Sequence, residues 1–193
     1  MGGQADRVVG VRKLYSGWLS LLLVDVRLGG EATTRPAIEH PSGVALLAYD
    51  PRRRLALTVE QTRVPLLMLG AARLAEPVAG VAEDETAEAA AARECREETG
   101  LTPRRLEPVG RVWMTPGSTT ERVDLFLAAY DEQDLARGDG GGGAEGELED
   151  IEVRERPLNE LWREAFGGQR ADAKLVLLLQ ALRLRRPELF AGV

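Results

Sequence analysis

The sequence has little of what disulfides, zinc clusters and membrane spans require. It holds one cysteine, Cys95, and one histidine, His40, so an internal disulfide and a Cys/His zinc cluster are both excluded. The longest apolar runs, residues 19–24 and 175–179, are far too short to span a bilayer. The first residues are polar and lack the apolar core of a signal peptide. These absences predict a cytoplasmic protein that does not bind membranes.

Excess positive charge is also missing. The chain of 193 residues has 25 Lys and Arg against 31 Asp and Glu, for a formal net charge of −6. This balance argues against a general nucleic-acid binder, which is usually basic. It leaves a small anionic substrate open, because a divalent metal reverses the local sign of the charge. The hydrophobic content of 44% and the length predict one globular domain with at most a small appendage.

Apolar periodicity predicts several strands and three helices along the chain. Glycine or Asp-Pro turns separate the expected strands from one another. The expected strands cover residues 7–14, 18–27, 43–49, 55–60, 109–114, 123–130 and 151–154, and the expected helices besides 85–99 cover 158–166 and 171–184. Residues 131–150 show no apolar period and include a glycine run. Such a long connection is predicted to be either functional or a solvated acidic linker.

Residues 85–99 form the clearest predicted helix, since they lack Gly and Pro and end at Gly100, a residue expected just past a helix. Glu94, Glu97 and Glu98 stand at i, i+3 and i+4, which places their carboxylates on one face. Each like-charge pair costs about 0.2–0.5 kcal/mol. A hard cation such as Mg²⁺ or Mn²⁺ would remove that repulsion. The alternative is a solvated surface face, on which Arg93 and Glu97 form an ordinary i,i+4 pair.

The order of these residues resembles a Nudix box. That family's pattern is Gly, five residues, Glu, seven residues, then Arg-Glu-apolar-any-Glu-Glu-any-Gly-apolar. Residues 80–101 match it from Glu85 onward, with Cys95 in the apolar slot. The departure is at the glycine end, where four residues instead of five separate Gly80 from Glu85. A shortened box of this kind is similar to that of the GDP-mannose pyrophosphatase branch.

The resemblance implies a fold and an assembly. The fold is an α/β Nudix sandwich of α/β/α layers with a mixed β-sheet, covering residues 41–193, with the box at 80–101. An antiparallel β arm over residues 1–40 precedes it and makes a homodimer. Arg93, Gly80, Glu85 and Gly100 are expected to support the box.

The resemblance also implies a divalent metal site. Its ligands would be the main-chain carbonyl of Ala79 and the carboxylates of Glu94, Glu98 and Glu149. Residues 147–153 resemble the end of a mobile catalytic loop, which makes Glu147 a candidate general base, with Glu97 as the other candidate. The expected cofactor is Mg²⁺ or Mn²⁺. If residues 131–150 are only an acidic linker, this role of Glu147 fails.

Five further residues match substrate contacts of these enzymes. Arg63 matches an arginine that grips phosphates, a task that suits a guanidinium fork, although a surface arginine at a strand end is the alternative. Arg35 and Glu39 match residues that reach into the partner's site, and Gly117 and Glu121 match a Ser-Pro-Gly segment that ends in a substrate-contacting Glu. His40 is expected to be a structural or surface histidine and not a catalyst, and Cys95 is expected to be a small core residue and not a nucleophile.

The predicted activity is hydrolysis of the pyrophosphate bond in a nucleoside diphosphate linked to a sugar, such as ADP-ribose or a GDP- or ADP-sugar. The products would be a nucleoside monophosphate and a sugar phosphate. Two alternatives stay open. One is a Nudix hydrolase of another nucleotide class, such as a nucleoside triphosphate or a dinucleoside polyphosphate. The other is a non-catalytic ligand sensor on the same fold, which would usually have lost box carboxylates that this chain keeps.

Overall fold

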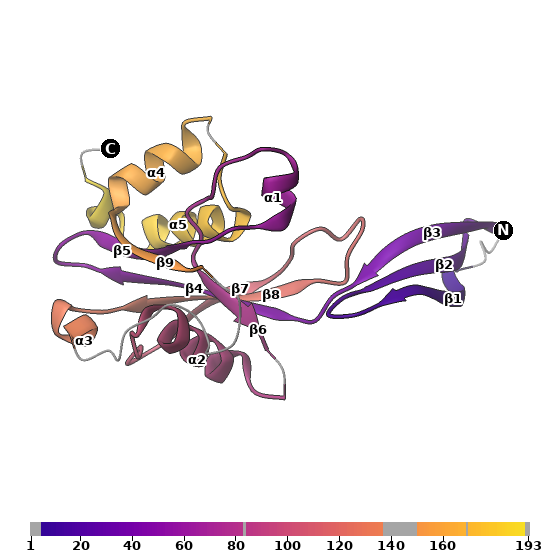
Figure 1. Cartoon of the computed structure of the whole chain (residues 1–193), viewed down its shortest axis with the longest axis horizontal. Coiled ribbons are helices and arrows are strands. Elements are labelled where there is room, and N and C mark those ends of the chain that lie inside the picture. Colours follow the sequence, from indigo (N-terminus) through magenta and orange to yellow (C-terminus); the bar gives the residue numbers. More distant parts are fainter. Residues whose placement is uncertain (1–4, 83, 137–149, 169, 192–193) are drawn as a thin grey trace. The chain divides into compact units, whose positions relative to one another are not determined.

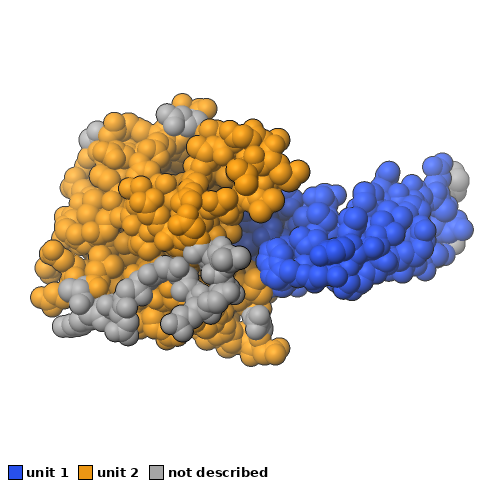
Figure 2. Space-filling model, in the orientation of Figure 1, with its two compact units in different colours: residues 1–42, 112–123 blue, residues 43–111, 124–193 orange. Residues whose placement is uncertain are grey.

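The computed structural model describes residues 5–82, 84–136, 150–168 and 170–191. The chain divides into two compact units, coloured separately in Figure 2. Unit 1 comprises residues 1–42 and 112–123, and unit 2 comprises residues 43–111 and 124–193. Within the described residues, no helix has both the length and the apolar character that crossing a membrane requires.

Unit 1 is built on a three-stranded antiparallel sheet of β1 (Arg7–Ser16), β2 (Ser20–Leu28) and β3 (Glu31–Glu39). Gly29 and Gly30 turn the chain between β2 and β3 with φ values of 58° and 93°, in the left-handed region that favours glycine. The arm of antiparallel strands is therefore present. Its third strand was not predicted, because the polar residues and Pro36 in β3 hide the apolar alternation.

Unit 2 is built around a six-stranded sheet, part of which continues into unit 1. Its order is β7 (Glu107–Trp113), β8 (Arg122–Ala129), β4 (Gly43–Asp50), β5 (Leu55–Glu60) and β9 (Glu152–Pro157). The short strand β6 (Val78–Val81) pairs antiparallel with β4, so that Ala79 lies opposite Ala45 and Gly80 opposite Val44. This pairing matters for function, because β6 leads directly into the predicted box.

Helices cover both faces of this sheet (Figure 1). Helix α2 (Ala87–Thr99) lies on one face, and α4 (Leu158–Phe166) and α5 (Ala173–Arg185) lie on the other. All eight residues of β4 are buried between these layers. Val44, Leu46 and Ala48 join one core cluster with the α2 residues Ala90, Ala91 and Cys95. The α/β/α sandwich expected from the sequence is confirmed.

The remaining short helices were not predicted. Helix α1 (Val64–Met68) is a single turn with a proline in its first turn, and the 3₁₀ helix η1 (Pro187–Phe190) follows α5. Helix α3 (Glu132–Ala136) lies at the start of the connection predicted to lack regular structure, so that expectation was wrong for its first residues. The cause is a local cap, in which the Asp134 N–H donates to Asp131 Oδ1 at 3.0 Å.

Candidate active site

Helix α2 has well-defined ends, which fix the register of the box. Thr86 caps the start, accepting a hydrogen bond from the Ala89 N–H at 3.2 Å. At the other end Gly100 adopts φ 74°, and its N–H donates to the Arg96 carbonyl at 2.8 Å. Only glycine takes this left-handed conformation without strain. The predicted helix and its glycine end are confirmed.

Arg93 joins the box into one charged network. Its guanidinium donates to Glu85 Oε1 from Nε at 2.9 Å and from Nη2 at 2.8 Å, to Glu94 Oε1 at 2.8 Å and to Glu97 Oε2 at 2.9 Å. A further bond reaches the carbonyl of Val81 on β6 at 3.1 Å. Burial alone would lower the pKa of Arg93, but the hydrogen bonds and charges of the three carboxylates outweigh burial and raise it. Arg93 therefore links Glu85, which precedes α2, and two glutamates of α2 to strand β6.

Gly80 and Glu94 approach each other closely where β6 passes α2. A Cβ atom placed on Gly80 would lie 2.0 Å from both the carboxylate carbon and Oε1 of Glu94. Any side chain at residue 80 would therefore displace the Glu94 carboxylate. The box glycine acts here through space and not through an unusual backbone angle, since its φ is outside the left-handed region.

The three glutamates of the box differ in exposure. Glu98 is only 5% exposed, while the side chains of Glu94 and Glu97 are 15% and 32% exposed. A carboxylate is costly to bury without hydrogen bonds or a cation. The gradient places Glu98 deepest, beside the apolar face of α2 that carries Cys95.

The donor chemistry of this face suits a hard divalent cation. Glu94 and Glu98 offer carboxylate oxygens one helical turn apart, and the Glu94 carboxylate lies against the main chain of β6, next to Ala79. Among the described residues, no three His, Cys, Asp or Glu side chains are grouped so that they could hold an ion. Two further predicted residues, the ligand Glu149 and the base Glu147, lie outside the described residues. The carboxylates present fit such an ion in kind.

A second charged cluster follows the end of β5 and was only partly predicted. Arg63 donates from Nε and Nη2 to the two carboxylate oxygens of Glu76, each at 2.9 Å. Lys174, at the start of α5, places Nζ 3.8 Å from Glu76 Oε2 and 2.7 Å from Asp172 Oδ2. No role was predicted for Glu76 or Lys174. The one available signal was that Glu76 begins the segment leading into the box.

The other predicted substrate residues belong to unit 1. Arg35 lies opposite Val24 in the arm sheet. Glu39 Oε2 forms an ion pair with Lys13 Nζ at 3.4 Å. Gly117 and Glu121 lie in the segment after β7, where the Met114 N–H donates to the Glu121 carbonyl at 3.4 Å. The substrate roles of these four residues stay predictions.

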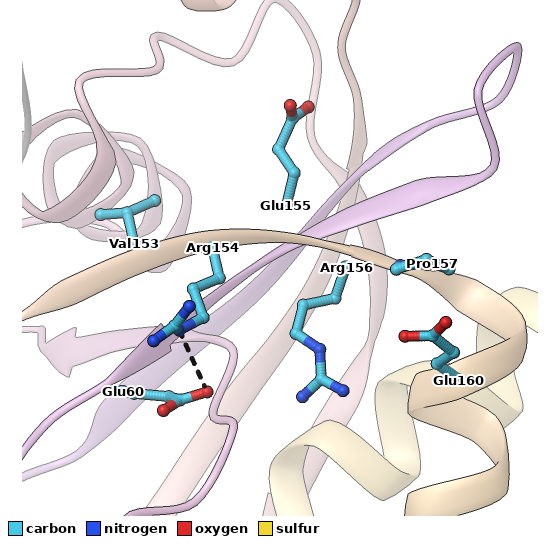
Figure 3. A pocket seen from close by; sticks show the side chains of 7 residues that line it. All are labelled: Glu60, Val153, Arg154, Glu155, Arg156, Pro157 and Glu160. Carbon is cyan, nitrogen blue, oxygen red and sulfur yellow. Dashed lines mark ion pairs between the residues drawn. The ribbon is translucent and has the colours of Figure 1, made fainter.

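An open cavity of about 490 Å³ lies along β9 in unit 2. Figure 3 shows Arg154 and Arg156 on one side of the strand and Glu155 on the other. Both arginines that line the cavity pair with carboxylates. Arg154 Nε lies 3.6 Å from Glu60 Oε1, and Arg156 Nη1 donates to Glu164 Oε2 at 3.1 Å. The cavity therefore presents paired charges and not a cationic surface, so no ligand is assigned to it.

Cys95 does not add a nucleophile to the site. Its side chain is fully buried in the core between α2 and the sheet. Burial raises the pKa of the thiol to about 12, so the reactive thiolate is nearly absent at neutral pH. The prediction that Cys95 is a small core residue is confirmed.

Comparisons with known proteins agree with this geometry. The NUDIX domain family matches residues 39–179. The GDP-mannose pyrophosphatases of Cronobacter sakazakii and Pectobacterium atrosepticum are 37% and 34% identical to the chain, over 78% and 76% of it and 78% and 75% of their own lengths. The GDP-mannose pyrophosphatase of Escherichia coli O1:K1 is 31% identical, over 78% of both chains.

A solved structure shows the same fold. The crystal structure of an ADP compounds hydrolase superposes with a TM-score of 0.75 and 17% identity, covering 97% of both chains. At that identity the likeness concerns the fold alone, whereas the family match and the pyrophosphatases above rest on sequence. The chain therefore belongs to the Nudix family of hydrolases, and within that family it is similar in sequence to the GDP-mannose pyrophosphatases.

Proposed function

We propose that the protein hydrolyses the pyrophosphate bond of a nucleoside diphosphate-sugar, such as a GDP-sugar, an ADP-sugar or ADP-ribose, and that it needs a divalent metal. The observation that carries the proposal is the box itself, in which the Glu94 carboxylate lies against Gly80 of β6 and Glu98, one helical turn further along α2, is buried. The GDP-mannose pyrophosphatases among its relatives support this substrate class.

Glu94, Glu98, Glu149 and the Ala79 carbonyl would hold Mg²⁺ or Mn²⁺. When bound, such an ion neutralises charge on the phosphates and makes a water molecule more acidic. Glu147 or Glu97 accepts the proton of the attacking water. Of these two, Glu97 accepts a hydrogen bond from Arg93 at 2.9 Å, so one of its carboxylate oxygens is already engaged. Glu147 is therefore the preferred candidate.

Arg63 would bind the phosphates. A guanidinium presents several N–H donors in one plane, which suits two phosphate oxygens at once. Its side chain is 38% exposed although its partner Glu76 is buried. Four further residues act indirectly: Arg93 links Glu85 to β6, Gly80 leaves room for Glu94, and Gly100 ends α2.

The arm would make a homodimer and bring Arg35 and Glu39 to the partner's site, while Gly117 and Glu121 complete the substrate contacts. Exposed apolar side chains on the arm support this assembly, because large exposed apolar patches mark association surfaces. They include Val8, Val9, Val11, Leu14, Tyr15 and Trp18, each at least 56% exposed. A cytoplasmic location and the absence of a nucleic-acid partner remain part of the proposal.

A substrate screen with product identification tests the function. GDP-mannose, other nucleoside diphosphate-sugars and ADP-ribose are incubated with protein and Mg²⁺, beside nucleoside triphosphates and dinucleoside polyphosphates. We expect a nucleoside monophosphate and a sugar phosphate from the first group. Cleavage only within the second group would show that the substrate class is wrong. Binding with a ligand-induced rise in Tm but without any cleavage would identify a sensor.

A further inference from the structure

Glu76 is an unusually buried carboxylate outside the box. It is 4% exposed, and it does not belong to the predicted metal ligands. Its backbone is fixed to β5, because the Glu76 N–H donates to the Val59 carbonyl and the Val59 N–H donates to the Glu76 carbonyl, both at 2.9 Å. The side chain therefore starts from a defined point beside the end of β5.

Cations from two different elements meet the Glu76 carboxylate. Arg63 follows β5 and uses Nε and Nη2, one edge of its guanidinium, to bind both oxygens. Lys174 approaches Oε2 from α5 and is itself held by Asp172, the residue that caps α5 by accepting from the Leu175 N–H at 2.9 Å. Glu76 is thus held by its own backbone hydrogen bonds and by Lys174, which Asp172 in turn holds at the start of α5.

This arrangement restricts the orientation of Arg63. Two parallel hydrogen bonds to a carboxylate fix the plane of a guanidinium as well as its position. The two side chains also differ in exposure, which is 5% for Glu76 and 38% for Arg63. The carboxylate is the buried partner of the pair, and the Arg63 side chain is the more exposed one.

We propose that Glu76 is a positioning residue, which orients Arg63 toward the pyrophosphate group of the substrate. The inference rests on the phosphate-binding role of Arg63 in the proposed function. Glu76 touches no reacting atom and acts only through Arg63. Stability alone does not require this ion pair, because well-packed apolar residues often replace such pairs without loss of stability.

Glu76→Gln and Glu76→Asp test this role. Gln keeps the size but loses the charge and one acceptor, whereas Asp keeps the charge and shortens the arm. We expect Glu76→Gln to raise KM and the Kd for inorganic pyrophosphate, measured by calorimetry at fixed Mg²⁺, by about tenfold or more, with a smaller change in kcat. Glu76→Asp should have an intermediate effect and secures the test if Glu76→Gln does not fold.

Asp124→Asn is the matched control. Asp124 also accepts a two-bond contact from one arginine, with Arg111 Nε at 2.9 Å from Oδ1 and Nη2 at 2.8 Å from Oδ2. It has no part in the site. KM and the Kd for pyrophosphate should be unchanged in this variant. A rise equal to that of Glu76→Gln would show that loss of any such ion pair suffices, and would overturn the inference.

The double variant Arg63→Ala/Glu76→Gln separates positioning from a general structural role. If Glu76 acts through Arg63, the double variant binds pyrophosphate no more weakly than Arg63→Ala alone. Additive losses, or no pyrophosphate binding by the wild-type protein, would contradict the inference. Non-additive pyrophosphate binding without cleavage of any nucleoside diphosphate-sugar would support the inference and refute the proposed function, so the two failures are distinguishable.

Discussion

Strand β4 in unit 2 and strand β1 in unit 1 both carry several aliphatic residues but place them differently. Every residue of β4 is buried between two layers of helices. In β1, by contrast, Val8, Val9 and Val11 are 61%, 63% and 56% exposed. Unit 2 therefore completes its core around β4 within its own residues, whereas unit 1 leaves much of its apolar surface in contact with solvent.

The two units depart from the usual division of side chains differently. Unit 2 buries acidic groups, among them Asp50, Glu76 and Glu98, and it also exposes single apolar side chains such as Met68 and Leu184. Unit 1 exposes apolar groups along the arm, and none of its described acidic residues is buried. Buried charges mark sites of chemistry or of structural ion networks, and exposed apolar surfaces mark association. We therefore predict that unit 2 carries the catalytic carboxylates and that unit 1 mediates self-association, and four variants test this prediction.

Of these four variants, Gly80→Ala should have the largest effect, and it should lower catalytic activity without changing stability. The new Cβ displaces the end of the flexible Glu94 side chain, so Tm should change little. A misplaced group of this kind costs about a hundredfold in rate, and kcat/KM should fall by at least that factor. Gly110→Ala is the control, because nothing lies within 4 Å of a Cβ there. Full activity in Gly80→Ala would show that the position of Glu94 does not matter.

Arg93→Met should mainly reduce stability. It removes the shared partner of Glu85, Glu94 and Glu97. Since the Arg93 side chain is 31% exposed, we expect a loss of about 2 kcal/mol in the free energy of unfolding, below the range for fully buried pairs. Arg111→Met, whose side chain is 59% exposed, should lose at most about 1 kcal/mol. If urea unfolding showed equal losses of unfolding free energy in the two variants, Arg93 would contribute no more to stability than an ordinary surface ion pair.

Asp50→Asn tests a buried charge without a catalytic role. Burial would raise the pKa of Asp50, but hydrogen bonds from the Arg53 and Arg52 N–H groups and the Arg53 guanidinium outweigh it and hold the pKa below its ordinary range. The stability this carboxylate adds is present above about pH 4, the ordinary value, and is lost as the pH falls through the folded-state pKa. We expect Asp50→Asn to lose about 1–2 kcal/mol at pH 7.

Urea unfolding of the wild type and Asp50→Asn at several pH values checks the sign. The difference between the two proteins should narrow as the medium becomes more acidic than about pH 4. A difference that widens in acid would show that the Asp50 carboxylate is not stabilised in its charged form. Catalytic activity at pH 7 should be unchanged, because Asp50 lies at the β4–β5 turn and outside the box.

Of the four variants, Val11→Asp should change the stability and the activity of the folded chain least. It places a charge on the exposed arm surface and should weaken self-association by about tenfold or more, measured by sedimentation. Its Tm should stay near that of the wild-type monomer. Leu184→Asp is the control, since Leu184 is 85% exposed on α5 in unit 2. A weakened dimer in Leu184→Asp alone would place the association surface on unit 2 instead.

Local patterns predicted most of the elements. The strand at Leu55–Glu60 and the helix at Leu158–Phe166 were predicted with their observed bounds. Helix α2 was predicted at 85–99 and begins at Ala87, because Thr86 and not Glu85 provides the cap. Strand β3 was missed because its alternation is polar and interrupted by Pro36. Spacing and capping act over a few residues, and the sequence displays them directly.

The contacts that build the site were less predictable. The helix spacing placed Glu94, Glu97 and Glu98 on one face, but it did not show that Gly80 makes room for Glu94. The pairing of Glu76 with Lys174 joins residues far apart in the sequence. Such a contact depends on how β6 and α5 pack around β4, which periodicity alone does not determine.

The central claim is that the box carboxylates hold a divalent metal for hydrolysis, and Glu98→Gln tests it most directly. Gln keeps the size of the buried side chain while removing its charge. We predict that Mn²⁺ binding measured by calorimetry is strongly weakened and that kcat/KM for the cleaved nucleoside diphosphate-sugar falls about a thousandfold or more, with the fold intact. Wild-type Mn²⁺ affinity and full activity in Glu98→Gln would contradict it.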